Sequence, residues 1–320
     1  MKGGSTVTKV ITTRNLTKTF QGKEIISNLN LHVNKGEIYG FLGPNGAGKT
    51  TVMKMLMNLV KPSAGEIELF GQRLTSQSYE MLKRIGSMIE FPIFYEKLSA
   101  RENLELHCEY MGYYKPSAIE EALEMVKLQL TGSKAVKDFS LGMKQRLGIA
   151  RAICTKPELL ILDEPINGLD PVGIKEIRQL FQTLCNEYGV TILISSHILS
   201  EIEQIADTVG VIRNGMLVAE VALDDIRSQQ TEYIELLTYD ARKALYVLDN
   251  ELGLKNVKLM DQSLIRIYDH HLTQNQLSKT LISNDVNIEA IARKNHSLED
   301  YFMNLIEGDE NSAEVDSTRI

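Results

Sequence analysis

Two short motifs carry residues typical of phosphate chemistry. The first, GPNGAGKT at 43–50, fits the pattern G-x-x-x-x-G-K-[ST] and lies between an apolar run, IYGFL, and a helix-like run, KTTVMKMLMNLV. Glycines let such a loop wrap closely, so that backbone N–H groups and a helix N-terminus face phosphate oxygens. Lys49 is then placed to bridge β- and γ-phosphates, and Thr50 to bind magnesium. The residues expected to contact a nucleotide here are Gly43, Pro44, Asn45, Gly46, Ala47, Gly48, Lys49, Thr50 and Thr51.

The second motif, ELLILDEP at 158–165, is an apolar run that ends in two acids. At the carboxyl end of a parallel strand beside a phosphate loop, Asp163 can hold magnesium through water. Glu164 would point towards the γ-phosphate and has the position of a general base for an attacking water. Two acids at a strand end could also merely cap a turn, but the phosphate loop in the same chain favours chemistry.

A third acid, Glu90, lies within the largely apolar stretch SMIEFPIFYEKLS at 87–99. A carboxylate is costly in apolar surroundings unless it is paired, solvated or bound to a cation. The run RIGSMI at 84–89 is expected to be a strand that leads into Glu90. From the residues alone, Glu90 is either paired or bound to a cation, or it is an exposed acid without a role.

The elements that must position these residues follow an α/β pattern, because short apolar runs alternate with helical patterns through the first 220 residues. The central strands are expected at 37–42, 159–163, 191–196 and 208–213. Ser99 and Ser117 each precede a Glu three residues on, which predicts two capping boxes, and Gly112 can close the first helix. The helical spacing of a second group predicts a buried stripe: Ile119, Leu123, Val126 and Leu130.

The pattern changes after Val221. The expected order is strand 232–238, helix 240–252, strand 256–261, strand 263–269, helix 272–283, strand 286–292 and a short helix from Ser297. This β-α-β-β-α-β order is the ferredoxin-like pattern and predicts a small second α/β domain at 226–306. His270 and His271 fall in an expected loop, where a solvated turn is favoured over a metal site. An acidic tail at 307–320 is expected to be disordered.

Composition limits the function classes. A net charge of −7 and a pI near 5.5 argue against a nucleic-acid binder, which usually needs a dense basic face. Cys108, Cys154 and Cys185 are odd in number and show no C-x-x-C spacing, so we expect free thiols in a reducing compartment. No apolar run approaches the roughly 20 residues of a membrane helix, and the start MKGGSTVTKV lacks the apolar core of a signal peptide. A cytosolic chain is expected.

In combination, these motifs resemble the ATP-binding cassette (ABC) family of transport ATPases. The segment FSLGMKQRLGIARAI at 139–153 is similar to the family's signature motif, in which a serine and a glycine at a helix N-terminus bind the γ-phosphate held by the opposite subunit. Ser140 and Gly142 match that pattern. Met143 stands where the family usually has Gln, so the resemblance leaves the side-chain contact open, and the neighbouring Lys144 and Gln145 are candidates to supply it.

Three further positions take their roles from the resemblance. Asp170, in NGLDP at 167–171, resembles the D-loop aspartate and also reads as an ordinary helix N-cap before Pro171. His197 resembles the switch histidine that contacts the γ-phosphate. Phe20 stands where the family stacks an aromatic ring on adenine, although a core phenylalanine is the alternative.

The resemblance covers about residues 9–225 and implies an α/β P-loop NTPase cassette at 1–225, with a RecA-like core, an antiparallel β subdomain and a helical subdomain at about 91–155. It implies ATP and Mg²⁺ as cofactors, and a homodimer that closes head to tail around two ATP molecules. It also implies an integral membrane permease as partner, no nucleic acid, and a place on the inner face of a bacterial membrane.

Subfamily resemblance suggests the cargo. The stretches at 88–104 and 139–150, with the C-terminal extension, look most like the bacitracin-export and lantibiotic-immunity branch, in which a Glu replaces the usual Gln at the position of Glu90. In most of the family that Gln contacts magnesium and the attacking water, so the resemblance makes Glu90 both a catalytic and a metal-binding candidate. The alternatives are export of another drug or lipid, and a soluble cassette ATPase of translation or DNA maintenance. The soluble members generally carry two cassettes or a long coiled coil, and this sequence shows one cassette and no sustained heptads. The intact set of Lys49, Asp163, Glu164 and His197 argues against an inactive nucleotide sensor.

Overall fold

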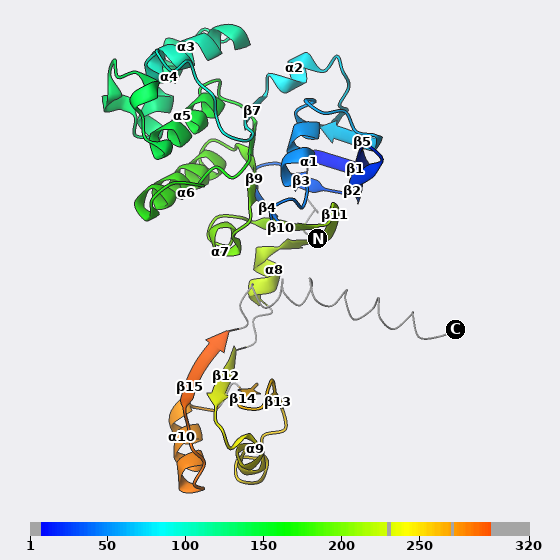
Figure 1. Cartoon of the computed structure of the whole chain (residues 1–320), viewed down its shortest axis with the longest axis vertical. Coiled ribbons are helices and arrows are strands. Elements are labelled where there is room, and N and C mark those ends of the chain that lie inside the picture. The colour runs from blue at the N-terminus through cyan, green and yellow to red at the C-terminus, as the bar shows by residue number, and fades with distance from the viewer. Residues whose placement is uncertain (1–7, 229–231, 270–271, 296–320) are drawn as a thin grey trace, which may run out of the picture. The chain divides into compact units, whose positions relative to one another are not determined.

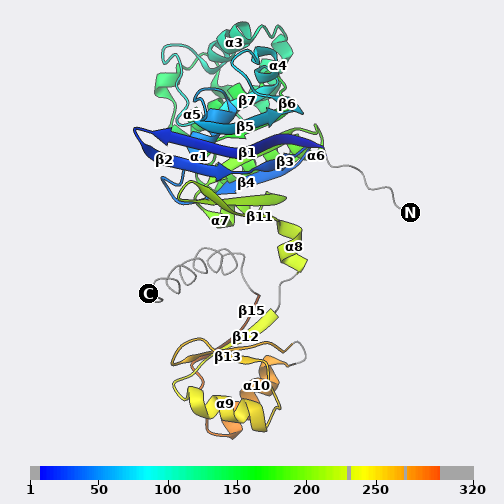
Figure 2. The ribbon, with the colours of Figure 1, turned by 90° about the vertical axis from the view of Figure 1, so that its right-hand side faces the viewer.

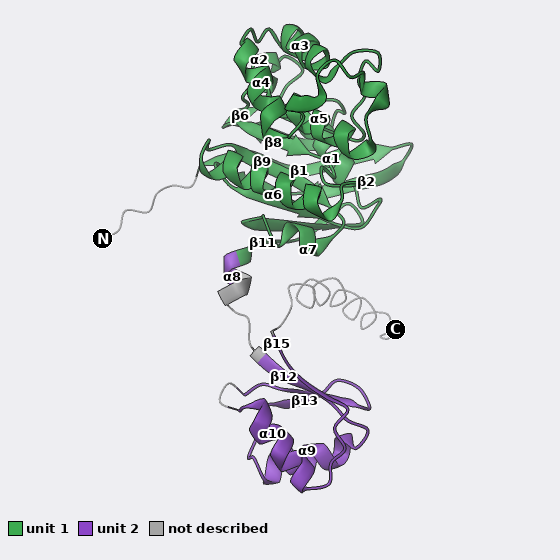
Figure 3. Cartoon of the chain, turned by 90° about the vertical axis from the view of Figure 1, so that its left-hand side faces the viewer, with its two compact units in different colours: residues 1–223 green, residues 224–320 purple. Residues whose placement is uncertain are grey.

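The computed structural model describes residues 8–228, 232–269 and 272–295 of the 320-residue chain. The chain divides into two compact units, residues 1–223 and 224–320 (Figure 3). Within the described ranges, no helix combines the length and apolarity that crossing a bilayer requires. The final helix expected from Ser297, the tail at 307–320, and His270 with His271 lie outside the described residues.

A six-stranded sheet forms the centre of the first unit. Its order is β11-β10-β4-β9-β8-β7, and all neighbours are parallel except β10 and β11. The strands are β4 (Ile38–Leu42), β7 (Ile85–Met88), β8 (Leu159–Leu162), β9 (Thr191–Ser196), β10 (Thr208–Arg213) and β11 (Met216–Ala222). Every residue of β8 and β9 is buried, as expected of strands covered on both faces. The expected central strands are confirmed, and their carboxyl ends share one edge.

A second, antiparallel sheet has the order β2-β1-β5-β6, with β3 paired to β1. Its strands are β1 (Lys9–Phe20), β2 (Lys23–Leu29), β3 (His32–Asn34), β5 (Ala64–Leu69) and β6 (Gln72–Arg73). One hydrophobic core joins this sheet to the central sheet and to α1 (Lys49–Leu56), through buried residues such as Ile11, Phe41 and Met53. The phosphate loop therefore leads into a helix that is held between two sheets, as Figure 1 shows.

Helices complete the first unit. They are α2 (Tyr79–Leu82), α3 (Ala100–Met111), α4 (Pro116–Met125), α5 (Leu141–Ile153), α6 (Pro171–Asn186) and α7 (Leu199–Ile202), with short 3₁₀ turns at Gln129–Thr131 and Val136–Asp138. α6 and α7 pack on β4 and β9, whereas α5 contacts β7, α3 and α4. Figure 2 shows α3 and α4 together at one end of the unit.

The structure confirms one predicted capping box and corrects the other. Ser99 caps α3 through the backbone N–H of Glu102, whose carboxylate bonds back to Ser99, and Gly112 ends the helix in the left-handed region. Ser117 caps nothing, because Pro116 occupies the first turn and the N-cap is Lys115. Glu120 pairs with Arg101 instead.

The predicted buried stripe holds at three of four positions. Ile119, Leu123 and Val126 are buried, but Leu130 is 93% exposed. Helix α4 stops at Met125, and Lys127 adopts a φ of 60°, so the chain leaves the helical path before Leu130 is reached. The periodic phase that predicted burial no longer applies after that turn.

The second unit has the predicted order of elements. Its members are β12 (Glu232–Leu237), α9 (Ala241–Asn250), β13 (Val257–Leu259), β14 (Leu264–Ile267), α10 (Gln274–Ser283) and β15 (Ala290–Asn295), and α8 (Leu223–Ser228) precedes them. The sheet order is β13-β14-β12-β15, with every neighbouring pair antiparallel. A separate core joins α9 and α10 to one face of this sheet. The last strand begins four residues later than the predicted 286, because residues 286–289 connect α10 to it.

All three cysteines are free thiols, as predicted, and all three are buried. Cys108 of α3 and Cys154 at the end of α5 nevertheless lie together, with 3.7 Å between their Sγ atoms. Burial raises the pKa of both thiols, so they stay protonated at neutral pH and are poor nucleophiles.

His107 of α3 makes the stability of the first unit sensitive to acid. Burial, with the nearby Arg151 guanidinium, lowers the pKa of His107 to about 4, below the usual value of 6.5. Between these two values the unfolded chain binds a proton that the folded chain does not, so stability falls as pH drops, by at most about 1.4 kcal/mol per pH unit. We expect His107→Gln to flatten the decline in urea midpoint between pH 6.5 and 4, measured by circular dichroism. A parallel decline in the wild type and the variant would contradict the assignment.

Candidate functional site

The phosphate loop joins β4 to α1, and two of its glycines are required by close packing. A Cβ on Gly43 would lie 2.4 Å from the carbonyl oxygen of Ile212. Gly48 caps α1 with a φ of 111°, and a Cβ there would lie 2.4 Å from Ile26 Cδ1. A side chain at either position would push the loop away from the sheet edge, so these glycines fix the path that the backbone N–H groups follow.

Asp163 and Thr50 meet across this loop. The Thr50 hydroxyl donates to Asp163 Oδ2 over 2.7 Å, and the Ser195 hydroxyl donates to Asp163 Oδ1 over 2.6 Å. Asp163 is only 6% exposed, and both of its oxygens are therefore held in place. A hydroxyl beside a carboxylate is a suitable pair of oxygen ligands for magnesium, which normally completes its shell with phosphate and water. The residues fit the metal that the sequence predicts.

Glu164 lies between two cationic or potentially cationic side chains. Its Oε1 is 3.4 Å from Lys49 Nζ, and its Oε2 is 2.9 Å from His197 Nδ1. Lys49 also donates to the carbonyl oxygens of Gly43, over 2.6 Å, and Pro44, over 3.3 Å. The structure therefore brings the phosphate-loop lysine, the second acid of DEP and the predicted switch histidine into one cluster.

The backbone of Glu164 is strained, with a φ of 48°. Such a conformation costs of order 1–3 kcal/mol in a residue with a side chain and persists only where the surroundings enforce it. Ser195 Oγ accepts the Glu164 N–H over 2.9 Å, and Gln145 Nε2 donates to the carbonyls of Glu164 and Pro165 over 3.1 and 2.9 Å. In this conformation the Glu164 carboxylate lies 3.4 Å from Lys49 Nζ.

Ser195 and Gln145 are the two residues that the sequence did not assign to this role. Ser195 falls within the expected strand 191–196, and the resemblance makes Gln145 a candidate contact for the nucleotide of the opposite subunit. That expectation is wrong for Gln145, which is 4% exposed and bonded inside its own chain. Lys144 lies on the surface, 3.6 Å from Glu96.

Glu90 follows β7, which ends at Met88 rather than at the predicted residue 89. Its side chain is 61% exposed and pairs with Lys54 of α1 over 2.5 Å, so it is not isolated among apolar groups. Glu90 has a φ of 61° and lines a pocket together with Gln145, Asp163, Glu164 and Asn167. The structure thus places Glu90 in one pocket lining with Asp163 and Glu164, and an ion pair ties it to α1, the helix that follows the phosphate loop.

The signature segment and the segment 167–171 pack against each other. Ser140 caps α5 by accepting the N–H of Met143 over 3.2 Å, and Gly142 lies in the first turn. A Cβ on Gly142 would lie 3.4 Å from Leu169 Cδ2. Asp170 caps α6 by accepting the N–H of Gly173 over 2.8 Å, which confirms the predicted N-cap.

Phe20 lies at the end of β1 and is 46% exposed, with the Lys18 ammonium 4.7 Å from its ring centre. The alternative of a core phenylalanine is therefore wrong. The exposed ring leaves the predicted adenine contact open to test.

Comparisons with known proteins agree with this geometry. The ABC transporter family model matches residues 26–167. An uncharacterized ABC transporter ATP-binding protein, YcbN of Bacillus subtilis, is 62% identical over 96% of this chain and 100% of its own length. The bacitracin transport ATP-binding protein BcrA of Bacillus licheniformis is 47% identical over 93% of this chain and 98% of its own. The lantibiotic transport ATP-binding protein SrtF of Streptococcus pyogenes is 41% identical over 72% of this chain and 98% of its own length.

Solved structures show the same cassette fold. An ATP-binding subunit of an ABC transporter superposes with a TM-score of 0.62 at 31% identity, over 69% of this chain and 92% of its own. The dimeric cassette MJ0796, in a post-hydrolysis state with ADP and phosphate, gives a TM-score of 0.61 at 26% identity, over 67% of this chain and 98% of its own.

Proposed function

The chain belongs to the ABC transporter ATP-binding proteins and is an ATPase of that type, and from this premise we propose that it powers export of a peptide antibiotic through a separate membrane permease. The observation that carries the proposal is the match to a bacitracin transport ATP-binding protein over 93% of the chain, which includes the second unit. The match to the lantibiotic transport protein covers only 72% of the chain. A bacitracin-type cargo is therefore favoured over a lantibiotic.

In this proposal the residues that carry out hydrolysis are Lys49, Thr50, Asp163, Glu164 and His197. Lys49 exchanges its bonds to the loop carbonyls for the β- and γ-phosphates, and Thr50 with Asp163 holds magnesium, which offsets phosphate charge when bound. Glu164, already turned towards Lys49, accepts a proton from the attacking water, while His197 holds Oε2 of that carboxylate. Phe20 offers its exposed ring to adenine.

A homodimer completes each site in the proposed mechanism. Ser140 caps α5 and Gly142 lies in its first turn, where backbone N–H groups and the helix dipole suit a γ-phosphate from the opposite subunit. Gly168 and Leu169, which directly precede Asp170, pack on that helix start, so hydrolysis at one site can move the signature segment that serves the other site. A dimeric relative with bound ADP and phosphate supports this arrangement.

The permease is proposed to dock on the aromatic segment that follows Glu90. Phe91, Ile93 and Tyr95 are each at least 55% exposed, as is Tyr110 of α3. Arg151 fixes the segment, since its guanidinium donates to the Ile93 carbonyl over 2.9 Å and lies 5.0 Å from the Phe94 ring centre. Exposed aromatic side chains on a supported loop are typical of a partner-binding surface.

Glu90 is proposed to be the link between the nucleotide and this surface, because it lines a pocket with Asp163 and Glu164 and directly precedes Phe91. We expect Glu90→Gln to keep most of the ATPase activity, because the amide has the same shape and can still contact water and metal. Glu90→Ala should reduce transport-coupled resistance more than hydrolysis. Intact resistance in the alanine variant would refute the link.

A matched variant separates this role from the ion pair. Lys54→Gln removes the partner of Glu90 and leaves the carboxylate, and an exposed pair is worth only about 0–1 kcal/mol. If Lys54→Gln reproduced the effect of Glu90→Ala, the carboxylate would act through the lysine rather than through the nucleotide.

We further propose that residues 1–225 form the cassette, with its helical subdomain at about 91–155, and that 226–306 form a ferredoxin-like accessory domain. The supporting observations are the β-α-β-β-α-β order and the antiparallel strand order β13-β14-β12-β15. The proposed place of the protein is the inner face of a bacterial membrane, held there by the permease.

The direct test is a resistance assay. Co-expression with its cognate permease in a bacitracin-sensitive host should raise the inhibitory concentration of bacitracin, and the Glu164→Gln variant should abolish the gain. Equal resistance with both forms would contradict ATP-driven export, and a gain for an unrelated drug alone would contradict the cargo.

A further inference from the structure

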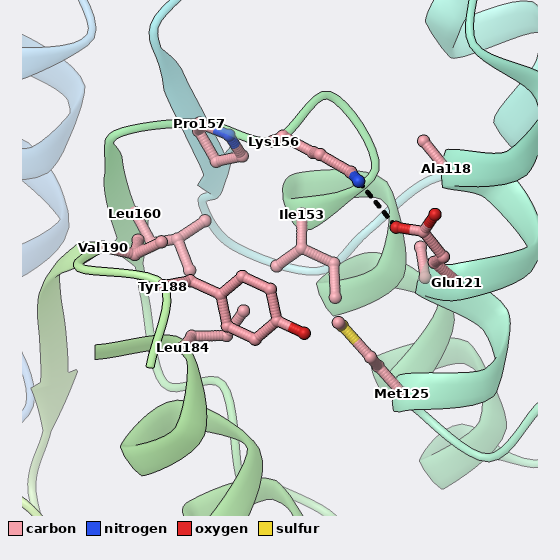
Figure 4. A pocket seen from close by; sticks show the side chains of 11 residues that line it. Ala118, Glu121, Met125, Ile153, Lys156, Pro157, Leu160, Leu184, Tyr188 and Val190 are labelled. Carbon is pink, nitrogen blue, oxygen red and sulfur yellow. Dashed lines mark ion pairs between the residues drawn. The ribbon is translucent and has the colours of Figure 1, made fainter. Parts of the chain in front are cut away.

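The first unit contains a mostly apolar pocket that the proposed nucleotide chemistry does not use (Figure 4). Its cavity volume is about 140 Å³, close to the roughly 150 Å³ of apolar cavities that hold one benzene ring. The principal lining side chains come from four elements or their ends: Ala122, Met125, Ile153, Leu160, Leu184 and Tyr188.

Polar groups are few and lie at defined points of the lining. The Tyr188 ring lies across the pocket with its hydroxyl directed towards Met125 (Figure 4). Lys156 and Glu121 form an ion pair of 2.6 Å at another side, which leaves no unpaired charge facing the cavity from either residue. Tyr188 is 60% exposed, so the pocket is open to small molecules from solvent. Such a lining suits an uncharged ring with one hydrogen-bonding group and disfavours an ion.

The position of the pocket relates it to the nucleotide site. Leu160 lies in β8, whose other end leads to Asp163 and Glu164. Ile153 ends α5, which Ser140 begins, and Leu184 lies near the end of α6, which Asp170 begins. Three elements therefore run from this pocket to the residues proposed to bind and hydrolyse ATP, and α4 closes the pocket from the helical part.

We propose that this pocket is a regulatory site for a small, uncharged aromatic molecule with one hydrogen-bonding group, which changes ATP hydrolysis without competing with ATP. The binding part stands on the cavity itself, whereas the regulatory part rests on the proposed function. A ligand between α4 and the ends of α5, β8 and α6 would fix the helical part relative to the sheet. It would thereby change how readily the signature segment at the start of α5 reaches the nucleotide of the second subunit.

Indole is a suitable probe, because it fills about this volume and carries one N–H that the Tyr188 hydroxyl can accept. We expect saturable binding with a Kd on the order of 1 mM, reported by the methyl signal of Met125 in ¹³C-methionine-labelled protein. Met125→Leu assigns the signal. An unmoved Met125 signal would overturn the site.

Two variants test whether the signal reports the pocket. Ala122→Leu fills the cavity and should abolish the shift. Tyr188→Phe, at an exposed position that does not threaten folding, should weaken binding by about three- to tenfold through loss of one hydrogen bond. A shift that survives unchanged in both variants would overturn the proposal.

The regulatory part is tested on the full chain at saturating ATP. We expect indole to change steady-state hydrolysis by about fivefold in the wild type and not in Ala122→Leu, with the KM for ATP unchanged. Competition with ATP, or no change in rate when Met125 is saturated, would overturn regulation from this site. A chain without any ATPase activity would contradict the proposed function, while the Met125 measurement would still decide whether the pocket binds.

Discussion

Glu164→Gln should lower steady-state ATP hydrolysis by about 10²- to 10⁴-fold, the usual contribution of a positioned general base. The amide keeps the shape of the carboxylate but cannot accept the proton of an attacking water. Nucleotide binding should survive, because Lys49, Thr50 and Asp163 are untouched. The measurements are phosphate release and ATP binding on the same preparation.

The same variant should accumulate as a dimer with ATP, since closure is expected to need ATP and reopening to need hydrolysis. Size-exclusion chromatography with light scattering reports the change. Glu158→Gln is a matched control, because Glu158 lies just before the first residue of β8, is half exposed and forms an ion pair with Arg84, away from the phosphate loop. Near wild-type turnover in Glu164→Gln would show that Glu164 is not the general base.

The cluster around Glu164 illustrates what the sequence could predict. Apolar runs of four to six residues located β4, β8 and β9, and parallel strands place their carboxyl ends at one edge. The sequence alone could therefore predict that residues following these strands lie close together, such as Lys49, Asp163 and His197. Their separation of up to about 150 positions along the chain did not matter, because strand topology removes it.

The supporting residues lacked any such signal. Ser195 is the fifth residue of a strand in which every residue is buried, so its place in the strand does not distinguish it from its apolar neighbours. Gln145 lies in α5, where its position alone did not distinguish an outward contact from a bond to the carbonyl of Pro165. Both act by satisfying particular backbone or carboxylate atoms, and such pairings depend on three-dimensional register rather than on sequence spacing.

Local rules failed where two signals competed. Ser117 has the correct spacing to Glu120 for a capping box, but Pro116 favours the first helical position more strongly because it lacks an N–H and has a fixed φ. Leu130 continues the helical spacing of apolar residues in the sequence, but the left-handed conformation of Lys127 ends the helix before Leu130 is reached. The carboxylate of Glu90 was expected among apolar groups and instead meets Lys54, which comes from a helix 36 residues earlier.

Lys49→Ala should weaken ATP binding by about 10- to 100-fold, because a hydrogen bond between charged groups contributes about 1.5–3 kcal/mol. The lysine is 6% exposed and already lies within the loop, bonded to the Gly43 carbonyl, so its ammonium is held where phosphates are expected. Removal also deprives Glu164 of the cation 3.4 Å away. Isothermal titration calorimetry with ATP measures the loss.

Two controls separate the loss of phosphate contact from other effects. Lys61→Ala removes an exposed lysine beyond α1 and should leave ATP affinity unchanged. Lys49→Arg keeps the positive charge but replaces a compact ammonium with a planar fork that the narrow loop does not fit, so affinity should remain low. Full affinity in Lys49→Arg would mean that charge alone suffices, and unchanged affinity in Lys49→Ala would show that nucleotide binds elsewhere than the loop at 43–50.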